Sequence, residues 1–144
     1  MSYRRIEVDP LTPAIGAEIN GVDLAQPLDE QTFDEIHDAW MKHLVIFFRD
    51  QDLTLDQHKA FGRYFGDLHI HPAAPGPEGH PEIFTIHTDK DSMFSEGNGW
   101  HSDVSCDEEP PLGTMLQIHI VPPCGGDTMF SDMYGVYDAL SEPV

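Results

Sequence analysis

The chain has 144 residues, of which 40% are hydrophobic and 10% aromatic, and its formal net charge is −19. This composition supports a globular core and excludes a disordered tail. The charge, with no basic stripe to meet phosphates, excludes a nucleic-acid-binding face, and no segment approaches the roughly 20 consecutive apolar residues of a membrane span.

The first half of the chain predicts, in order, two strands, a helix, a buried strand and a second helix. Asp29 can cap the first helix, whose apolar residues recur at helical spacing. Gln57 completes a capping box with Thr54 at the start of the second helix. The expected strands cover residues 4–9, 15–20 and 44–48, and the expected helices cover residues 30–43 and 54–65.

The second half is predicted to be mainly β. Residues 72–81 are dense in proline and glycine and are expected to form a loop, as are residues 88–99. Residues 112–121 alternate between apolar and mixed positions, which is typical of a strand with one face in a core. Strands punctuated by turns favour a β-sandwich or jelly roll with helices packed outside. The remaining expected elements are strands at 82–87 and 127–131 and a helix at 133–140.

The strongest candidate for a functional site is the stretch Trp100-His101-Ser102-Asp103. In an extended strand, positions two apart point to the same side, so His101 and Asp103 can direct an imidazole nitrogen and a carboxylate oxygen at one ion. Such a pair supplies two of the three ligands in the two-His-one-carboxylate face that holds Fe(II). A second His-x-Asp pattern, at residues 87–89, lacks the sequence context of the first, and no obvious second histidine completes the face.

That context is a series of motifs spread over nearly the whole chain. Their order and spacing resemble the N-terminal half of the taurine dioxygenase family, a branch of the Fe(II)- and 2-oxoglutarate-dependent oxygenases. The motifs are residues 15–24 (IGAEINGVDL), 44–51 (LVIFFRDQ), 65–72 (FGDLHIHP), 97–105 (GNGWHSDVS), 109–113 (EPPLG) and 125–128 (GGDT). The resemblance implies that residues 1–144 are the N-terminal half of a catalytic domain with an incomplete core. The implied fold class is mixed α/β but mainly β, a partial double-stranded β-helix (jelly roll, cupin-like) with flanking helices.

The resemblance also implies a metal and a co-substrate. Fe(II) would be held by His101, Asp103 and a second histidine outside these 144 residues. The hydroxyl of Thr128, in the Gly-Gly-Asp-Thr motif, would help to bind 2-oxoglutarate. Lys90 is the only Lys or Arg between Tyr64 and Val144, so a cationic anchor for the distal carboxylate comes either from Arg4, Arg5, Arg49 or Arg63 or from sequence outside these 144 residues. The resemblance implies the second of these.

Two further residues correspond to substrate-binding positions in that family. His71 occupies the position that holds the anionic head of the substrate, and Asn98 lies one place from the position of a substrate-binding asparagine, where this chain has Gly97. A family tyrosine three residues after the first of these is Ala74 here. Both departures change the volume and polarity of the pocket, so a different or bulkier small anion is as good a candidate as taurine.

The implied activity is hydroxylation of a small, anionic organic substrate by dioxygen, dependent on Fe(II) and 2-oxoglutarate, with succinate and CO2 as co-products. Two alternatives stay open: a truncated, inactive fragment of such an enzyme, or a small cupin-like metal-binding module that uses His119 or His87 as its third ligand. We expect no signal peptide, because residues 1–5 lead into a polar strand pattern. We expect a cytoplasmic location, because the two cysteines form no disulfide framework. Its expected partner is a small-molecule substrate rather than a nucleic acid or membrane, and homo-oligomerisation stays open.

Overall fold

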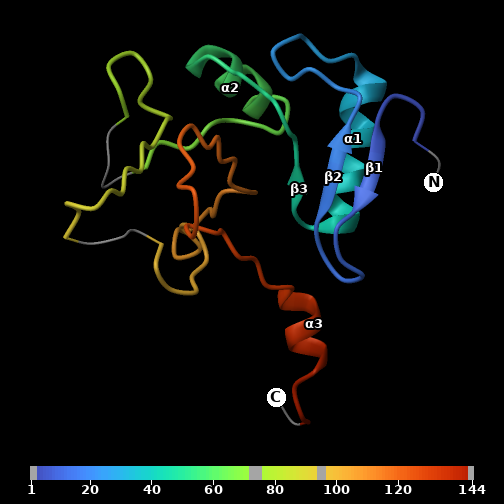
Figure 1. Ribbon diagram of the computed structural model, residues 1–144. Coiled ribbons are helices and arrows are strands. Elements are labelled where there is room, and N and C mark those ends of the chain that lie inside the picture. The colour runs from blue at the N-terminus through green and yellow to red at the C-terminus, as the bar shows by residue number, and fades with distance from the viewer. Residues whose placement is uncertain (1–2, 72–75, 94–96, 143–144) are drawn as a thin grey trace. The chain divides into compact units, whose positions relative to one another are not determined.

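The computed structural model describes residues 3–71, 76–93 and 97–142. The chain divides into two compact units, the first made of residues 1–54 and 120–144 and the second of residues 55–119. Within the described residues the regular elements are one three-stranded sheet and three helices, so the chain is mixed α and β (Figure 1). None of the described helices has the length and apolar character needed to cross a membrane.

The sheet of the first unit joins two strands that are close in sequence to a third that lies further along the chain. Strand β1 (Glu7–Pro10) pairs antiparallel with β2 (Ala17–Asn20), and β2 pairs in parallel with β3 (Ile46–Phe47). Two glycines bound the central strand: Gly16 has φ +90° and Gly21 has φ +82°. Only glycine adopts this backbone region without steric cost, so these positions allow the chain to turn at both ends of β2.

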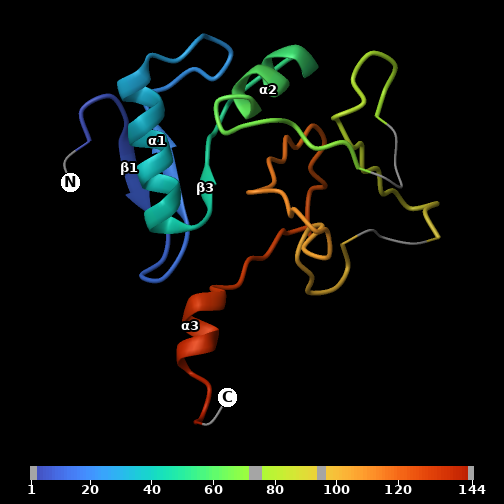
Figure 2. The same cartoon turned by 180° about the vertical axis from the view of Figure 1, so that it is seen from behind.

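Helix α1 (Glu30–His43) packs along one face of this sheet, as both views show (Figures 1 and 2). It begins at Asp29, whose carboxylate accepts a hydrogen bond of 2.8 Å from the backbone N–H of Thr32, as the capping prediction required. Ile36 and Ala39 are fully buried. The buried apolar core of the unit consists of Ile6, Ala17, Ile19, Leu24, Ile36, Ala39 and Leu53.

The segment before β1 is fastened to α1 by one carboxylate. Oε2 of Glu35 accepts hydrogen bonds from the backbone N–H groups of Arg4 at 2.9 Å, Arg5 at 2.8 Å and Ile6 at 3.3 Å. Desolvation raises the pKa of Glu35, but the bonds from Arg5, Arg4 and the Gln31 side chain outweigh it, and the net pKa lies below the ordinary value of 4.5. Glu35 therefore joins the N-terminal segment to the helix while it carries its charge.

The other two helices are short. Helix α2 (Leu55–Gly62) opens the second unit, where Phe61 is buried and meets Phe65 edge-on, with ring centroids 5.5 Å apart. Helix α3 (Met133–Asp138) belongs to the first unit and is capped by Asp132. The rest of the described second unit consists of turns and irregular backbone.

Several predicted strands are wrong for the described part of the chain. Residues 82–87, 112–121 and 127–131 form no strand, and β3 is a two-residue, half-buried strand rather than a five-residue strand buried on both faces. A strand needs a neighbour to pair its backbone groups, and no described segment supplies one to these residues. The predicted apolar face of residues 112–120 is consequently exposed, with Leu112 at 68%, Leu116 at 56% and Ile118 at 64%.

Replacing Ile36 by alanine should reveal how much of the stability resides in the contact between α1 and the sheet. Ile36 is fully buried, so the substitution leaves a cavity and should lower the free energy of unfolding by about 2–5 kcal/mol. Urea unfolding followed by far-UV circular dichroism measures the change. Met41→Ala on the same helix is the matched control, because Met41 is 47% exposed and should cost less than about 0.5 kcal/mol. Equal losses in the two variants would contradict this account of the core.

Replacing Glu35 by glutamine tests the N-terminal fastening through its pH dependence. The folded-state pKa of Glu35 is lowered, so its charge stabilises the fold fully above about pH 4.5, and this contribution is lost as the pH falls through the lowered value. The wild type should exceed Glu35→Gln in stability at pH 7, and the difference should vanish in acid. Asp34→Asn controls for removal of one negative charge from the helix. A difference that is independent of pH would rule out the carboxylate bonds as its cause.

Candidate metal centre

His101 and Asp103 come together in the second unit, on irregular backbone rather than on a strand. Nε2 of His101 lies 3.1 Å from Oδ1 of Asp103. The chain turns over residues 103–106, with Val104 in the left-handed region at φ +47° and the N–H of Asp107 donating to the carbonyl of Val104 at 3.3 Å. The expectation that strand alternation aligns the pair is therefore wrong, since the turn brings the two side chains together.

The spacing of these two atoms suits a shared metal ion. Nitrogen and oxygen ligands lie about 2.0–2.2 Å from a first-row divalent ion, so two ligands at right angles are about 3 Å apart. The observed 3.1 Å is the length of a direct ion pair between the two groups and is also compatible with that spacing. Both side chains are about half exposed, at 56% and 48%, so a ligand can reach them. The donor set of one imidazole and one carboxylate fits Fe(II).

A second contact fixes the tautomer of His101. Its Nδ1 lies 2.7 Å from the carbonyl oxygen of Gly99, which can only accept, so Nδ1 carries the proton and Nε2 is the ring atom left for a metal. The bond to Gly99 and the charge of Asp103 raise the pKa of His101 above its ordinary value of 6.5. The raised pKa favours the protonated ring, so a metal that binds Nε2 competes with a proton for this nitrogen.

The described residues do not complete a three-ligand site. Among them, no group of three or more His, Cys, Asp and Glu side chains is close enough to hold an ion. His87 pairs with Asp89 at 3.4 Å, and neither His87 nor His119 joins the His101 pair. The self-contained metal module is thus not assembled by the described part of the chain.

His69 makes a contact near the metal pair that the sequence did not predict. Its Nε2 lies 3.3 Å from Oδ2 of Asp107, at the end of the turn that carries Asp103. The pair joins the segment around residues 65–71 to this turn. The sequence contained no signal for it beyond the presence of another histidine two residues before His71.

The other predicted site residues are His71, Asn98 and Thr128. His71 stacks on Phe84, with ring centroids 5.1 Å apart and ring planes 19° apart. Asn98 is exposed in the second unit, and Thr128 is exposed in the first unit on backbone without regular structure. Ala74 lies outside the described residues.

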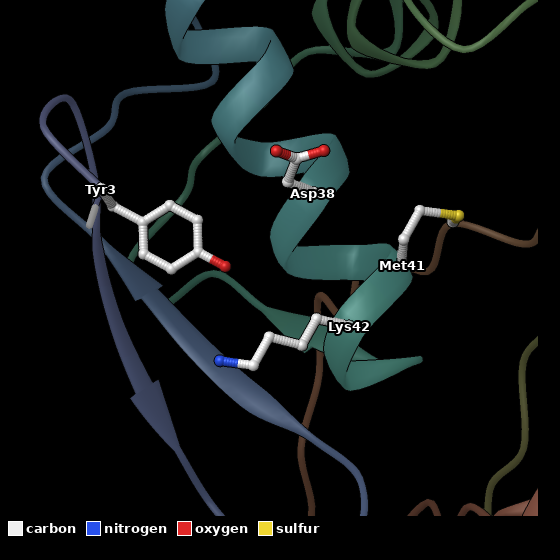
Figure 3. Close-up of a pocket in the computed structure, with 4 residues that line it drawn as sticks. All are labelled: Tyr3, Asp38, Met41 and Lys42. Atoms are coloured by element: carbon white, nitrogen blue, oxygen red, sulfur yellow. The ribbon is translucent and has the colours of Figure 1, made fainter. Parts of the chain in front are cut away.

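A hollow in the first unit contains none of the predicted site residues. Tyr3 faces α1 across it, and Asp38, Met41 and Lys42 extend from the helix (Figure 3). Desolvation and the nearby charges of Asp38 and Glu35 raise the pKa of the Tyr3 phenol. The hollow is open and its polar groups do not match the donor set of the metal pair, so we assign it no role.

Comparison with known proteins gives matches over almost the whole chain. Residues 7–144 match the model of the family "Taurine catabolism dioxygenase TauD, TfdA family". An alpha-ketoglutarate-dependent sulfonate dioxygenase of Saccharomyces cerevisiae is 33% identical over 97% of the chain, and an (S)-phenoxypropionate/alpha-ketoglutarate-dioxygenase of Sphingobium herbicidovorans is 35% identical over 94%. A crystal structure from Burkholderia xenovorans, assigned as an alpha-ketoglutarate-dependent taurine dioxygenase, has 43% identity and a TM-score of 0.83 over 96% of the chain.

The chain spans only part of each of these proteins. It covers 36% of the yeast protein, 48% of the Sphingobium protein and 49% of the Burkholderia chain. The match therefore extends along this chain but over at most half of its relatives.

Metal titration of the 144-residue chain should separate the two His-x-Asp pairs. Mn(II) should broaden the Hε1 resonance of His101 in NMR spectra at lower concentrations than that of His87. Loss of one of two ligands should weaken binding at least about tenfold in His101→Ala, while His87→Ala should leave the affinity unchanged. The His87 pair is the matched control, because it has the same residue types and a similar exposure but a longer nitrogen–oxygen distance, 3.4 Å against 3.1 Å. Equal effects of the two variants would overturn the assignment of the site.

Proposed function

Because the chain belongs to the taurine catabolism dioxygenase TauD, TfdA family, we propose that it supplies part of the iron site of a 2-oxoglutarate-dependent dioxygenase acting on a small organic anion. The observation that carries this proposal is the 3.1 Å approach of His101 Nε2 to Asp103 Oδ1. Two ligands at this spacing supply two corners of the Fe(II) face, and a histidine outside these 144 residues supplies the third.

In this proposal, residues 1–144 are the N-terminal half of a catalytic domain. Bound iron with 2-oxoglutarate supplies the oxidising chemistry, in which dioxygen hydroxylates a substrate C–H bond and 2-oxoglutarate becomes succinate and CO2. The protein binds and orients the reactants. His101 and Asp103 hold the metal, and the Gly99 carbonyl fixes the orientation of the His101 imidazole. The His69–Asp107 pair joins the turn at residues 103–106 to the segment around residues 65–71.

The co-substrate and substrate roles rest on the family motifs. The Thr128 hydroxyl contributes a hydrogen bond to 2-oxoglutarate, and its exposed position is compatible with this role. His71 binds the anionic head of the substrate, and Asn98 contributes a polar contact. Sulfonate and phenoxypropionate, in the names of two relatives, are both anions, which supports an anionic substrate while leaving its carbon skeleton undefined.

The proposed fold of the complete domain is a double-stranded β-helix. The alternating residues 112–121 support it, because their apolar face is exposed here and would be buried once neighbouring strands pair with them. We further propose a cytoplasmic location, consistent with two exposed free cysteines, Cys106 and Cys124.

Turnover of 2-oxoglutarate tests the proposed activity. The assay measures Fe(II)-dependent succinate formation with a panel of sulfonates, sulfate esters and carboxylates. It compares the 144-residue chain with a C-terminally extended protein, in which the added sequence supplies first a histidine and then an arginine. We expect turnover in the extended protein and at least a hundredfold loss in its His101→Ala variant, since a direct ligand exceeds the effect of its outer-shell partners.

His87→Ala in the extended protein is the control and should retain turnover. Activity in the extended protein but not in the 144-residue chain agrees with an iron site that takes two ligands from these residues and the third from the extension. An extended protein that binds iron but forms no succinate with any substrate would contradict the proposal.

A further inference from the structure

The predicted anion-binding histidine has an aromatic partner that the family motifs do not include. The rings of His71 and Phe84 stack with their centroids 5.1 Å apart and their planes 19° apart. Thirteen positions separate the two residues, so this is a tertiary contact between different segments rather than a consequence of local spacing. Phe84 remains 42% exposed, which distinguishes it from a residue that serves the core.

The segment that carries Phe84 is fastened to α2. Two residues earlier, the Glu82 carboxylate lies 3.9 Å from Nζ of Lys59 and 3.4 Å from Nη2 of Arg63. Lys59 is buried, at 9% exposure, and the Glu82 side chain is only 19% exposed, so this contact is shielded from solvent on one side. The N–H of Ile83 also donates to the carbonyl of His80 at 3.1 Å, which closes the turn before Phe84. Phe84 is therefore presented from an anchored segment.

Stacking constrains an imidazole without using its hydrogen-bond donors. The contact occupies one face of the ring, whereas the N–H bonds lie in the ring plane and point outward from its edge. Phe84 can thus hold the ring plane of His71 through one ring face.

We propose that Phe84 is a positioning residue of the anion subsite, which orients the His71 imidazole toward the carboxylate or sulfonate head of the substrate. This inference rests on the proposed function, in which His71 binds that head. The side chain of Phe84 takes the place of an aromatic wall near His71, at a sequence position different from Ala74, where the family has its tyrosine. The Glu82 contacts with Lys59 and Arg63 act through Phe84 by holding its segment.

Two NMR readouts on the 144-residue chain test the proposal. The ring current of Phe84 should shift the Hε1 resonance of His71, and Phe84→Leu should remove that shift while Phe84→Tyr retains it. Titration with ethanesulfonate, and separately with propionate, should perturb the same resonance. The dissociation constant should rise about two- to fivefold in Phe84→Leu and return to the wild-type value in Phe84→Tyr.

The controls separate this inference from the function on which it rests. Ile86→Ala removes an apolar side chain of similar exposure, 51%, from the same segment and should change neither readout. His71→Ala should abolish the titration. If His71→Ala binds both anions as the wild type does, or if the wild type binds neither, the role of His71 fails and the inference fails with it. If His71→Ala loses binding while Phe84→Leu keeps wild-type affinity and shift, only the role of Phe84 is overturned.

Discussion

The hydrogen bond between Nδ1 of His101 and the carbonyl of Gly99 is the constraint on which the metal pair depends. The pair is half exposed, so burial does little to hold the ring. A 2.7 Å bond to a backbone atom two residues away fixes both the orientation of the imidazole and the nitrogen that carries its proton. With Nε2 directed at Asp103, the remaining requirement is the turn at residues 103–106, which places the carboxylate within 3.1 Å. A site formed by such local contacts can exist before the rest of its ligands are present.

The missing third ligand and the exposed apolar face of residues 112–120 share one physical cause in the proposed domain. A facial iron site needs a ligand from another part of the fold, and an alternating strand needs neighbours that pair with its backbone and cover its apolar side. The described residues provide neither. Because the chain spans at most half of its relatives, both gaps would be filled by the same complementary half.

The structure could be predicted from the sequence where neighbouring residues determine it. The Asp29 cap and the span of α1 follow from capping and periodicity within a few positions, and the structure confirms both. The conformation of residues 112–121 could not be predicted in this way, because their strand pattern is clear but strand formation depends on distant partners.

At the candidate site, too, the features set by local sequence were predictable and the long-range contacts were not. The identities of His101 and Asp103 came from a local motif and a family resemblance, yet the strand expected to align them is a turn. The contacts of His69 with Asp107 and of His71 with Phe84 join segments far apart in sequence. Neither contact leaves a periodic trace, and only the folded chain could show them.

The charge distribution of the second unit explains why the orientation of a histidine matters there. Residues 55–119 contain three Lys or Arg side chains, and each already has a carboxylate within 4 Å: Lys59 and Arg63 contact Glu82, and Lys90 contacts Asp91. In a chain of net charge −19, an anionic substrate that approaches this unit finds no uncommitted ammonium or guanidinium group. In the proposed function, the imidazole of His71 binds the head of this substrate, and its N–H groups donate only along the ring plane. In the proposed anion subsite, the stack of His71 on Phe84 fixes that ring plane. It thereby gives the imidazole the fixed direction of hydrogen bonding that a planar guanidinium has in its own structure.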